Sequence, residues 1–246
     1  MQPFSLLLGV GALTGLLLVG WRAPQKETVR YLDAAVFSLF VALIISRGSF
    51  VWVNWGYYGY HVSEIIQVWQ GGLSSIGALA GGVLAIVILS MWWKLPSGLL
   101  ADTLLPLFGS LTITSWLGCW VGTCAYGFPS SAWWAMPARD EWGVLASRVP
   151  VQLIGSVTTL LIIWIADWAG RRVQIDGLTA ALGMFDIATV IFALSYLRAD
   201  PMPIWQGLRL EAWGAITLMI LSGLAVVVLL VRWKLRKSPI LNGRVE

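Results

Sequence analysis

Five arginines lie inside or beside apolar stretches of the chain, where a charged side chain is expensive. They are Arg47, Arg139, Arg148, Arg198 and Arg209. A charge near hydrocarbon costs a few kcal/mol on insertion scales and marks a functional hypothesis by default. A guanidinium can donate two parallel hydrogen bonds to one phosphate, so these residue types fit the recognition of a phospholipid headgroup.

A plainer role for these arginines is pairing with nearby acids, namely Asp140, Glu141, Asp200 and Glu211. Such pairs are common near helix ends and weak when exposed. This alternative applies to Arg139, Arg198 and Arg209. Arg47 stands within an apolar run, so we expect its partner to be a phosphate or the intramembrane acid Asp186.

Other residues with reactive side chains are few. Asp186 falls in the middle of an apolar run, and we predict a structural ion pair there, because a bare carboxylate in lipid is costly. His61 is the only histidine and lies in a loop, where a histidine is more often inert than a base. Cys119 and Cys124 lack companion ligands, so we predict no metal site and no cofactor, and expect both thiols to be buried as small apolar groups.

The elements that must position these residues are membrane helices. Only 11% of the 246 residues are charged, against roughly a quarter in soluble domains. A bilayer core about 30 Å thick needs about 20 apolar residues per helix. Seven runs meet this need: Phe4–Gly20, Ala34–Val53, Leu73–Trp93, Leu99–Val121, Val151–Trp168, Gly177–Leu197 and Ala212–Trp233. We predict an all-α integral membrane protein with seven transmembrane helices in one polytopic domain, residues 1–246, with the first run retained.

The distribution of lysine and arginine predicts the orientation. The cytoplasmic loops of membrane proteins carry an excess of these residues. They follow the first, third, fifth and seventh runs: Arg22, Lys26, Arg30, Lys94, Arg171, Arg172, Arg232, Lys234, Arg236, Lys237 and Arg244. We predict an outside N-terminus and a cytoplasmic C-terminus in a bacterial plasma membrane. The net charge of +4 then suits anionic headgroups, and the absence of a clustered basic footprint speaks against nucleic acid.

Two long loops fall on the predicted outer side. One covers residues 54–70 and is rich in tyrosine and glycine, which indicates an interfacial segment. The other covers residues 125–150 and carries Trp133, Trp134, Met136 and Trp142. We expect the second loop to be an amphipathic arm that dips into the outer leaflet.

The order of several short motifs resembles the bacterial prolipoprotein diacylglyceryl transferase family. The resemblance runs from about Arg47 to Arg209. It includes the stretch Trp69–Ser74 with Gly71, Gly72 and Ser74, then Gly77, Ala101-Asp102, Pro106, the glycine-containing helix end Leu117–Cys124 with Gly118, Arg148-x-Pro150-x-Gln152-Leu153, Leu197–Pro201 and Gly207–Leu210. Each motif is weak alone, but their order and spacing are specific. The resemblance implies a phosphatidylglycerol donor and a lipoprotein cysteine as acceptor.

This chain departs from the family pattern at most of its polar positions. Ile76 stands where the family has a histidine, and Trp116 stands where its glycine-asparagine signature begins with arginine. The signature's two asparagines and glutamate fall on Cys119, Gly122 and Cys124, and an arginine and a glutamate of the sixth span fall on Ile191 and Ser195. A pocket that transfers protons needs such groups, so no catalytic residue is assigned.

Two functions remain open from the sequence. The first is transfer of diacylglyceryl from phosphatidylglycerol to a prolipoprotein. The second is a non-catalytic phospholipid-binding or scaffold protein that works with other membrane subunits. In both, the resemblance and the charge placement predict that Arg47, Arg148, Gln152, Arg198 and Arg209 bind the lipid headgroup. An acyl carrier role for Cys119 or Cys124 is a lesser alternative, since no base activates either thiol.

Overall fold

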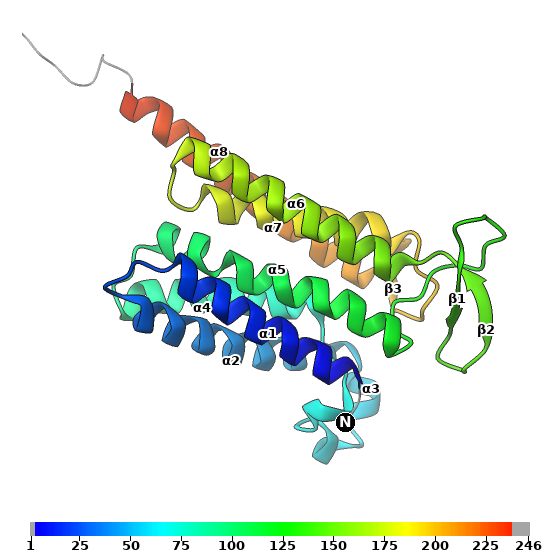
Figure 1. Cartoon of the computed structure of the whole chain (residues 1–246). Coiled ribbons are helices and arrows are strands. Elements are labelled where there is room, and N and C mark those ends of the chain that lie inside the picture. Colours follow the sequence, from blue (N-terminus) through cyan, green and yellow to red (C-terminus); the bar gives the residue numbers. More distant parts are fainter. Residues whose placement is uncertain (1–2, 238–246) are drawn as a thin grey trace, which may run out of the picture.

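The computed structural model describes residues 3–237 as seven long helices with shorter elements between them (Figure 1). The long helices are α1 (Pro3–Arg22), α2 (Thr28–Val53), α4 (Ser75–Trp92), α5 (Ser97–Val121), α6 (Val151–Val173), α7 (Leu178–Ser195) and α8 (Leu210–Lys237). All seven are long and apolar enough to span a membrane. The seven predicted spans are therefore confirmed, with ends shifted by a few residues.

The shorter elements lie between these spans. They are α3 (Trp55–Tyr58), the 3-10 turns η1 (Val62–Glu64) and η2 (Val68–Gln70), and two antiparallel hairpins, β1 (Met136–Arg139) with β2 (Leu145–Arg148) and β3 (Ile204–Trp205) with β4 (Leu208–Arg209). The chain is thus mostly helical. Within the loop of residues 125–150, where we expected an amphipathic arm, the chain forms the β1–β2 hairpin. Met136 pairs there with Arg148, and Arg139 pairs with Leu145.

Helix α5 is the centre of the bundle. It packs against α1 on one side and against α6 and α7 on the other, while α2 pairs with α4 and α7 pairs with α8 (Figure 1). Leu100, Leu104 and Leu107 of α5 are fully buried. Glycines let the backbones approach, as small residues do between membrane helices: a Cβ at Gly15 of α1 would lie 2.6 Å from the Leu107 side chain.

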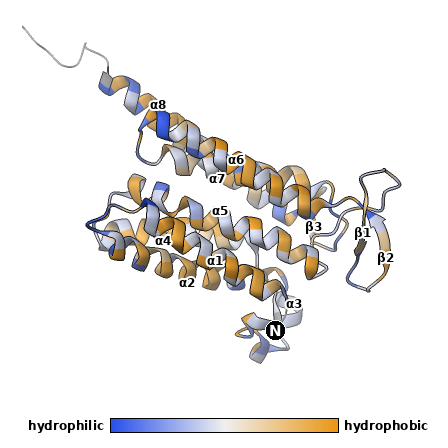
Figure 2. Cartoon of the chain, in the orientation of Figure 1, coloured by the Kyte–Doolittle hydropathy of each residue, from blue (hydrophilic) through white to orange (hydrophobic). Residues whose placement is uncertain are grey.

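The turns rich in lysine and arginine gather at one end of the bundle. We call it the basic end; it holds the turns at residues 23–27 and 93–96, the last turn of α6 with Arg171 and Arg172, and the last turns of α8. The N-terminus, α3 and both hairpins lie at the other end, the hairpin end (Figure 1). Figure 2 shows the apolar colouring along the long helices that separate the two ends. An outside N-terminus and a cytoplasmic C-terminus would require this separation of the two ends, and the orientation stays a prediction. Arg244, which was used for that prediction, lies outside the described residues.

The basic end is held by polar contacts between helices. The carboxylate of Asp102 in α5 accepts hydrogen bonds from the backbone N–H groups of Gly177 and Ala180, both at 2.7 Å, and so caps the start of α7. Arg22 at the end of α1 pairs with Asp167 of α6 at 2.6 Å. These contacts tie α1, α5, α6 and α7 together at this end.

Candidate functional site

Arg47 is held at the hairpin end by hydrogen bonds to four backbone carbonyls. Its side chain lies near the end of α2 and is 6% exposed. Its Nε donates to the carbonyl of Ile65 at 2.8 Å, Nη2 to Glu64 at 2.7 Å, and Nη1 to Gly71 and Gly72 at 2.7 and 2.9 Å. The Tyr58 ring centroid lies 5.1 Å away, within cation–π range. We call this arrangement the Arg47 staple. The prediction that Asp186 could be the partner of Arg47 is therefore wrong, because backbone carbonyls accept its hydrogen bonds instead.

The Gly-Gly-Leu-Ser motif forms the turn that Arg47 binds. Gly71 and Gly72 both have positive φ, 95° and 74°, which glycine adopts without strain. A side chain at Gly72 would also collide with Arg47, since a Cβ there would lie 2.6 Å from Nη1. Ser74 then caps α4 by accepting a hydrogen bond from the N–H of Gly77 at 3.1 Å. The motif therefore has a structural explanation in the described fold.

Arg198 and Arg209 share carboxylates between α7 and α8. Arg198 Nη2 lies 2.6 Å from Asp200, and Nη1 lies 2.7 Å from Glu211. Arg209 Nη2 lies 3.2 Å from Asp200. Burial by itself lowers the pKa of Arg198, but the two carboxylates outweigh it, and the net pKa is raised above its ordinary value. These are the ion pairs considered as the plainer alternative for both arginines.

Arg148 is linked to the segment of Arg198 through Tyr126 and the residues that follow it. Its Nη2 donates to Asp140 at 3.0 Å, and its guanidinium lies 4.9 Å from the Tyr126 ring centroid. The segment that follows Tyr126 pairs with the segment of Arg198, because the N–H of Ala199 donates to the Tyr126 carbonyl at 2.8 Å. We call Arg148, Arg198, Arg209, Asp140, Asp200 and Glu211 the arginine cluster. The structure thus groups three of the four predicted headgroup arginines and leaves Arg47 in a separate staple.

Several polar atoms of this region are buried without a hydrogen-bond partner among the described residues. They are Arg148 Nε, Gln152 Oε1, and Arg209 Nε and Nη2. Arg209 Nη2 is close enough to Asp200 for an ion pair, but is not aligned for a hydrogen bond. Gln152 is 2% exposed and uses its other amide atom, Nε2, to donate to the Cys124 carbonyl at 2.9 Å. Buried groups of this kind usually have a partner, in the protein or outside it.

The sequence profile of the prolipoprotein diacylglyceryl transferase family matches residues 1–231. This chain belongs to that family. A relative from Geobacillus kaustophilus, a phosphatidylglycerol–prolipoprotein diacylglyceryl transferase, is 33% identical over 89% of this chain and 84% of its own length. A transferase of the same description from Thermosynechococcus vestitus is 28% identical over 82% of this chain and 91% of its own length. Another, from Bacillus licheniformis, is 34% identical, but over only 48% of this chain and 43% of its own length.

The positions that depart from the family pattern serve helix packing. Ile76 of α4 lies against α8, since a Cβ at Gly214 would come 2.6 Å from its Cγ2. Trp116 of α5 is buried against α6, where a Cβ at Gly155 would come 2.5 Å from the indole. Ile191 and Ser195 of α7 are also buried. Ile76 and Trp116, at the positions where the resemblance led us to expect a histidine and an arginine, thus make apolar contacts between helices.

Cys119 and Cys124 form a disulfide, with Cα atoms 4.6 Å apart. The expectation of two buried free thiols is therefore wrong. The bond joins the last turn of α5 to the loop that leads to Tyr126, and Gly118 before it packs on Phe4 of α1, with 2.7 Å between a Cβ there and the ring. The expectation failed because five residues of separation place the second cysteine just past the helix end, where the chain turns back. An acyl carrier role needs a free thiol, which the oxidised pair lacks.

The remaining reactive candidates lie apart from the arginine cluster's carboxylates. Asp186 takes part in no ion pair among residues 3–237, so the predicted pair is wrong. Arg139 is exposed and donates to the carbonyl of Gly143 at 3.0 Å. His61 is exposed and stacks on Tyr57, with ring centroids 4.2 Å apart. A hydrogen bond to Glu64 raises the pKa of Tyr57. Within the described chain, neither His61 nor Tyr57 contacts an arginine of the cluster.

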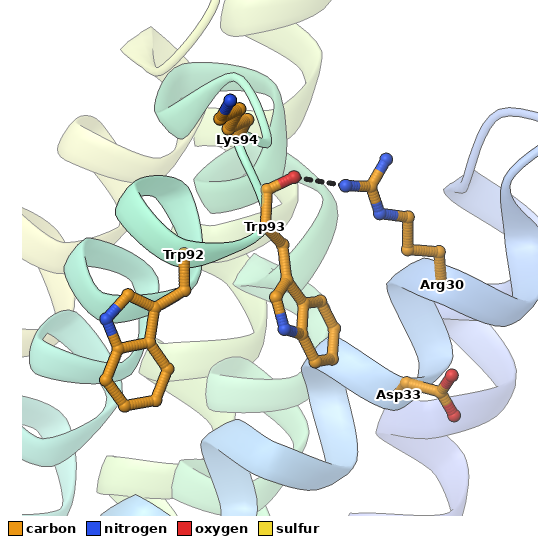
Figure 3. Close-up of a pocket in the computed structure, with 5 residues that line it drawn as sticks. All are labelled: Arg30, Asp33, Trp92, Trp93 and Lys94. Carbon is orange, nitrogen blue, oxygen red and sulfur yellow. Dashed lines mark hydrogen bonds between the residues drawn. The ribbon is translucent and has the colours of Figure 1, made fainter.

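An open pocket of about 450 Å³ lies at the basic end (Figure 3). Arg30 and Asp33 of α2 line one side, and Trp92, Trp93 and Lys94 line the other. Arg30 donates to the Trp93 carbonyl and so links α2 to the turn after α4. Tryptophan beside arginine and lysine is typical of a helix end in the headgroup layer. The pocket is at the opposite end of the bundle from the arginine cluster.

Proposed function

We propose that this protein binds phosphatidylglycerol at the arginine cluster without transferring its diacylglyceryl group. The observation that carries the proposal is the pair of unsatisfied buried groups, Arg148 Nε as a donor and Gln152 Oε1 as an acceptor. A phosphoglycerol headgroup offers the complementary atoms: phosphate oxygens accept and glycerol hydroxyls donate. The spare N–H groups of Arg209 extend the set of donors.

The charge of the cluster indicates how the headgroup is recognised. Its three arginines face three carboxylates, Asp140, Asp200 and Glu211. Excess positive charge therefore cannot hold a phosphate there, and directed hydrogen bonds must do so. Such recognition favours a headgroup with hydroxyl donors, and we expect phosphatidylglycerol to bind better than phosphatidic acid.

The proposed lack of transfer rests on the residues that stand where the resemblance implies groups for proton transfer. Transfer to a cysteine thiol requires a group that accepts the thiol proton and groups that stabilise developing charge. Ile76, Trp116 and the Cys119–Cys124 disulfide supply neither, and all are fixed by packing or by a covalent bond. Of the residues predicted to bind the headgroup, Arg148, Gln152, Arg198 and Arg209 are proposed for that role here, whereas Arg47 is occupied by backbone carbonyls.

The second candidate function is the family's own reaction, with prolipoprotein as acceptor. Membership of the family over residues 1–231 favours it. It would require a base that the family pattern does not supply here, and the exposed His61 is the only histidine. For either function we propose a multi-pass protein of the bacterial plasma membrane, one polytopic domain over residues 1–246, with the hairpin end outside and the basic end in the cytoplasm.

Lipid binding can be tested by native mass spectrometry of the detergent-purified protein titrated with phosphatidylglycerol. The variant Gln152→Leu removes the proposed hydrogen bond to the headgroup, worth about 1 kcal/mol, and should weaken binding about fivefold. It also removes the bond from Nε2 to the Cys124 carbonyl, so the melting temperature of the variant is measured beside its lipid binding. Arg139→Ala is the matched control, because Arg139 is exposed outside the cluster, and it should bind as the parent does. Equal binding by the parent and Gln152→Leu would refute the assigned site.

A further inference from the structure

Asp186 stands at mid-membrane depth. It lies eight residues from the start of α7 and nine from its end, which is about 12 Å from each at about 1.5 Å per residue. Asp186 is separate from the arginine cluster, which lies at the hairpin end of the bundle.

The side of α7 that carries Asp186 faces outward. Leu182, Asp186, Thr189 and Ala193 follow helical spacing, and all four are at least partly exposed. We call them the Asp186 stripe. The neighbouring faces of α7 are occupied: Gly183 packs on Leu105 of α5, Thr179 on Gly170 of α6 and Phe185 on Gly223 of α8. The stripe therefore lies on the part of α7 between its contacts with α6 and with α8, which these helices cover only partly.

No cation of these helices reaches the depth of Asp186. Helix α7 contains no lysine or arginine, the basic residues of α6 are Arg171 and Arg172 in its last turns, and the first one in α8 is Arg232. The carboxylate has no ion pair within the described chain. Thr189 turns its hydroxyl to its own helix, donating to Phe185 at 2.8 Å. A carboxylate left this way in hydrocarbon is costly, and membrane proteins place such groups against a partner.

We propose that the Asp186 stripe docks a transmembrane helix of another protein that carries a lysine or arginine at mid-membrane depth. Charge complementarity selects this occupant. A second copy of the chain would bring one Asp186 towards another, and lipid tails offer neither charge nor hydrogen bond. Ala193 and Thr189 are small, so a partner helix can approach closely, as membrane helix contacts require. The docking does not depend on lipid binding or on transfer.

The test measures energy transfer between labelled full-length protein and a labelled transmembrane peptide in phosphatidylcholine vesicles. The probe is a polyleucine helix with one central lysine, compared with the same helix without it. A polar contact in a membrane is worth about 1–2 kcal/mol, so the lysine peptide should associate about tenfold more strongly. Asp186→Asn should abolish this preference and Asp186→Glu should keep it. Thr189→Val, on the same stripe, is the matched control and should also keep it.

Two outcomes would overturn the proposal. One is equal association of the two peptides with the parent protein, which needs no variant and so does not depend on the folding of Asp186→Asn. The other is self-association of differently labelled copies that Asp186→Asn removes, which would make a second copy the occupant. Phosphatidylglycerol binding by each variant, measured separately, distinguishes loss of docking from loss of the lipid site.

Discussion

The Arg47 staple and the arginine cluster satisfy buried guanidinium groups by opposite means. Arg47 is surrounded by four backbone carbonyls from Glu64, Ile65, Gly71 and Gly72. Arg198 is held between the carboxylates of Asp200 and Glu211. The first arrangement engages all three nitrogens of the guanidinium with four hydrogen bonds to backbone carbonyls. The second neutralises charge while leaving donors of Arg148 and Arg209 unused.

This difference separates the structural role of Arg47 from the proposed binding role of the arginine cluster, although these residues look alike in sequence. Carbonyl dipoles hold the 64–72 segment in place around Arg47, so its removal should disturb that whole segment. The cluster is a set of ion pairs with spare donors, so the loss of one member should disturb fewer contacts.

Replacing Arg47 with alanine should give the largest loss of stability. Four carbonyls would lose a charged donor, and we expect a destabilisation of about 3–5 kcal/mol. Lysine at this position keeps the charge but not the forked geometry, so Arg47→Lys should be intermediate. Thermal unfolding in detergent and protease cleavage within residues 54–74 measure both. Unchanged melting and cleavage in Arg47→Ala would mean that the staple does not hold the segment.

Removing a carboxylate from the cluster should cost less. Asp200→Asn takes the shared partner from Arg198 and Arg209 and should destabilise by about 2–4 kcal/mol. Asp140→Asn takes the carboxylate from Arg148 alone and should have the smaller effect. Comparison of the two melting temperatures decides the matter: an effect of Asp140→Asn equal to or above that of Asp200→Asn would contradict the described pairing.

Opening the Cys119–Cys124 disulfide should have the smallest effect of the three. The bond closes a loop with a sequence separation of 5, and chain-entropy arguments give about 2 kcal/mol for a loop this short. Adding a reductant should lower the melting temperature of the parent protein, while the double variant Cys119→Ser/Cys124→Ser should be insensitive to it. Alkylation of both cysteines without prior reduction would show that the bond is not formed.

The spans were predictable from the sequence because their signal is local. An apolar run such as Val151–Trp168 predicts a helix independently of its neighbours. Only the predicted ends differ from the structure, where α6 continues through Arg171 and Arg172 to Val173. The hairpin of residues 136–148 was not predictable in the same way. Its tryptophans indicate an interface, and Trp133 is 95% exposed, but they do not distinguish a helix from paired strands.

The sequence singled out the arginines of the proposed site but not all of the groups that they contact. Arg198 and Arg209 form ion pairs with acids that are close in sequence, as the plainer alternative predicted. Arg47 instead binds carbonyls 17 to 25 positions away, and backbone atoms leave no trace in residue types. The disulfide was missed because a cysteine pair at a helix end resembles buried thiols in sequence. Only the path of the chain after Val121 brings the two sulfurs together.

The central claim is that this family member binds phosphatidylglycerol but does not transfer its diacylglyceryl group. The most direct test is a gel-shift lipidation assay with detergent-purified protein, phosphatidylglycerol and a prolipoprotein substrate, run beside an active transferase of the family. We predict no shifted product above the blank while the active enzyme gives product. A shifted product from this protein, lost on Arg148→Ala, would contradict the claim and show that other residues have taken over the reaction.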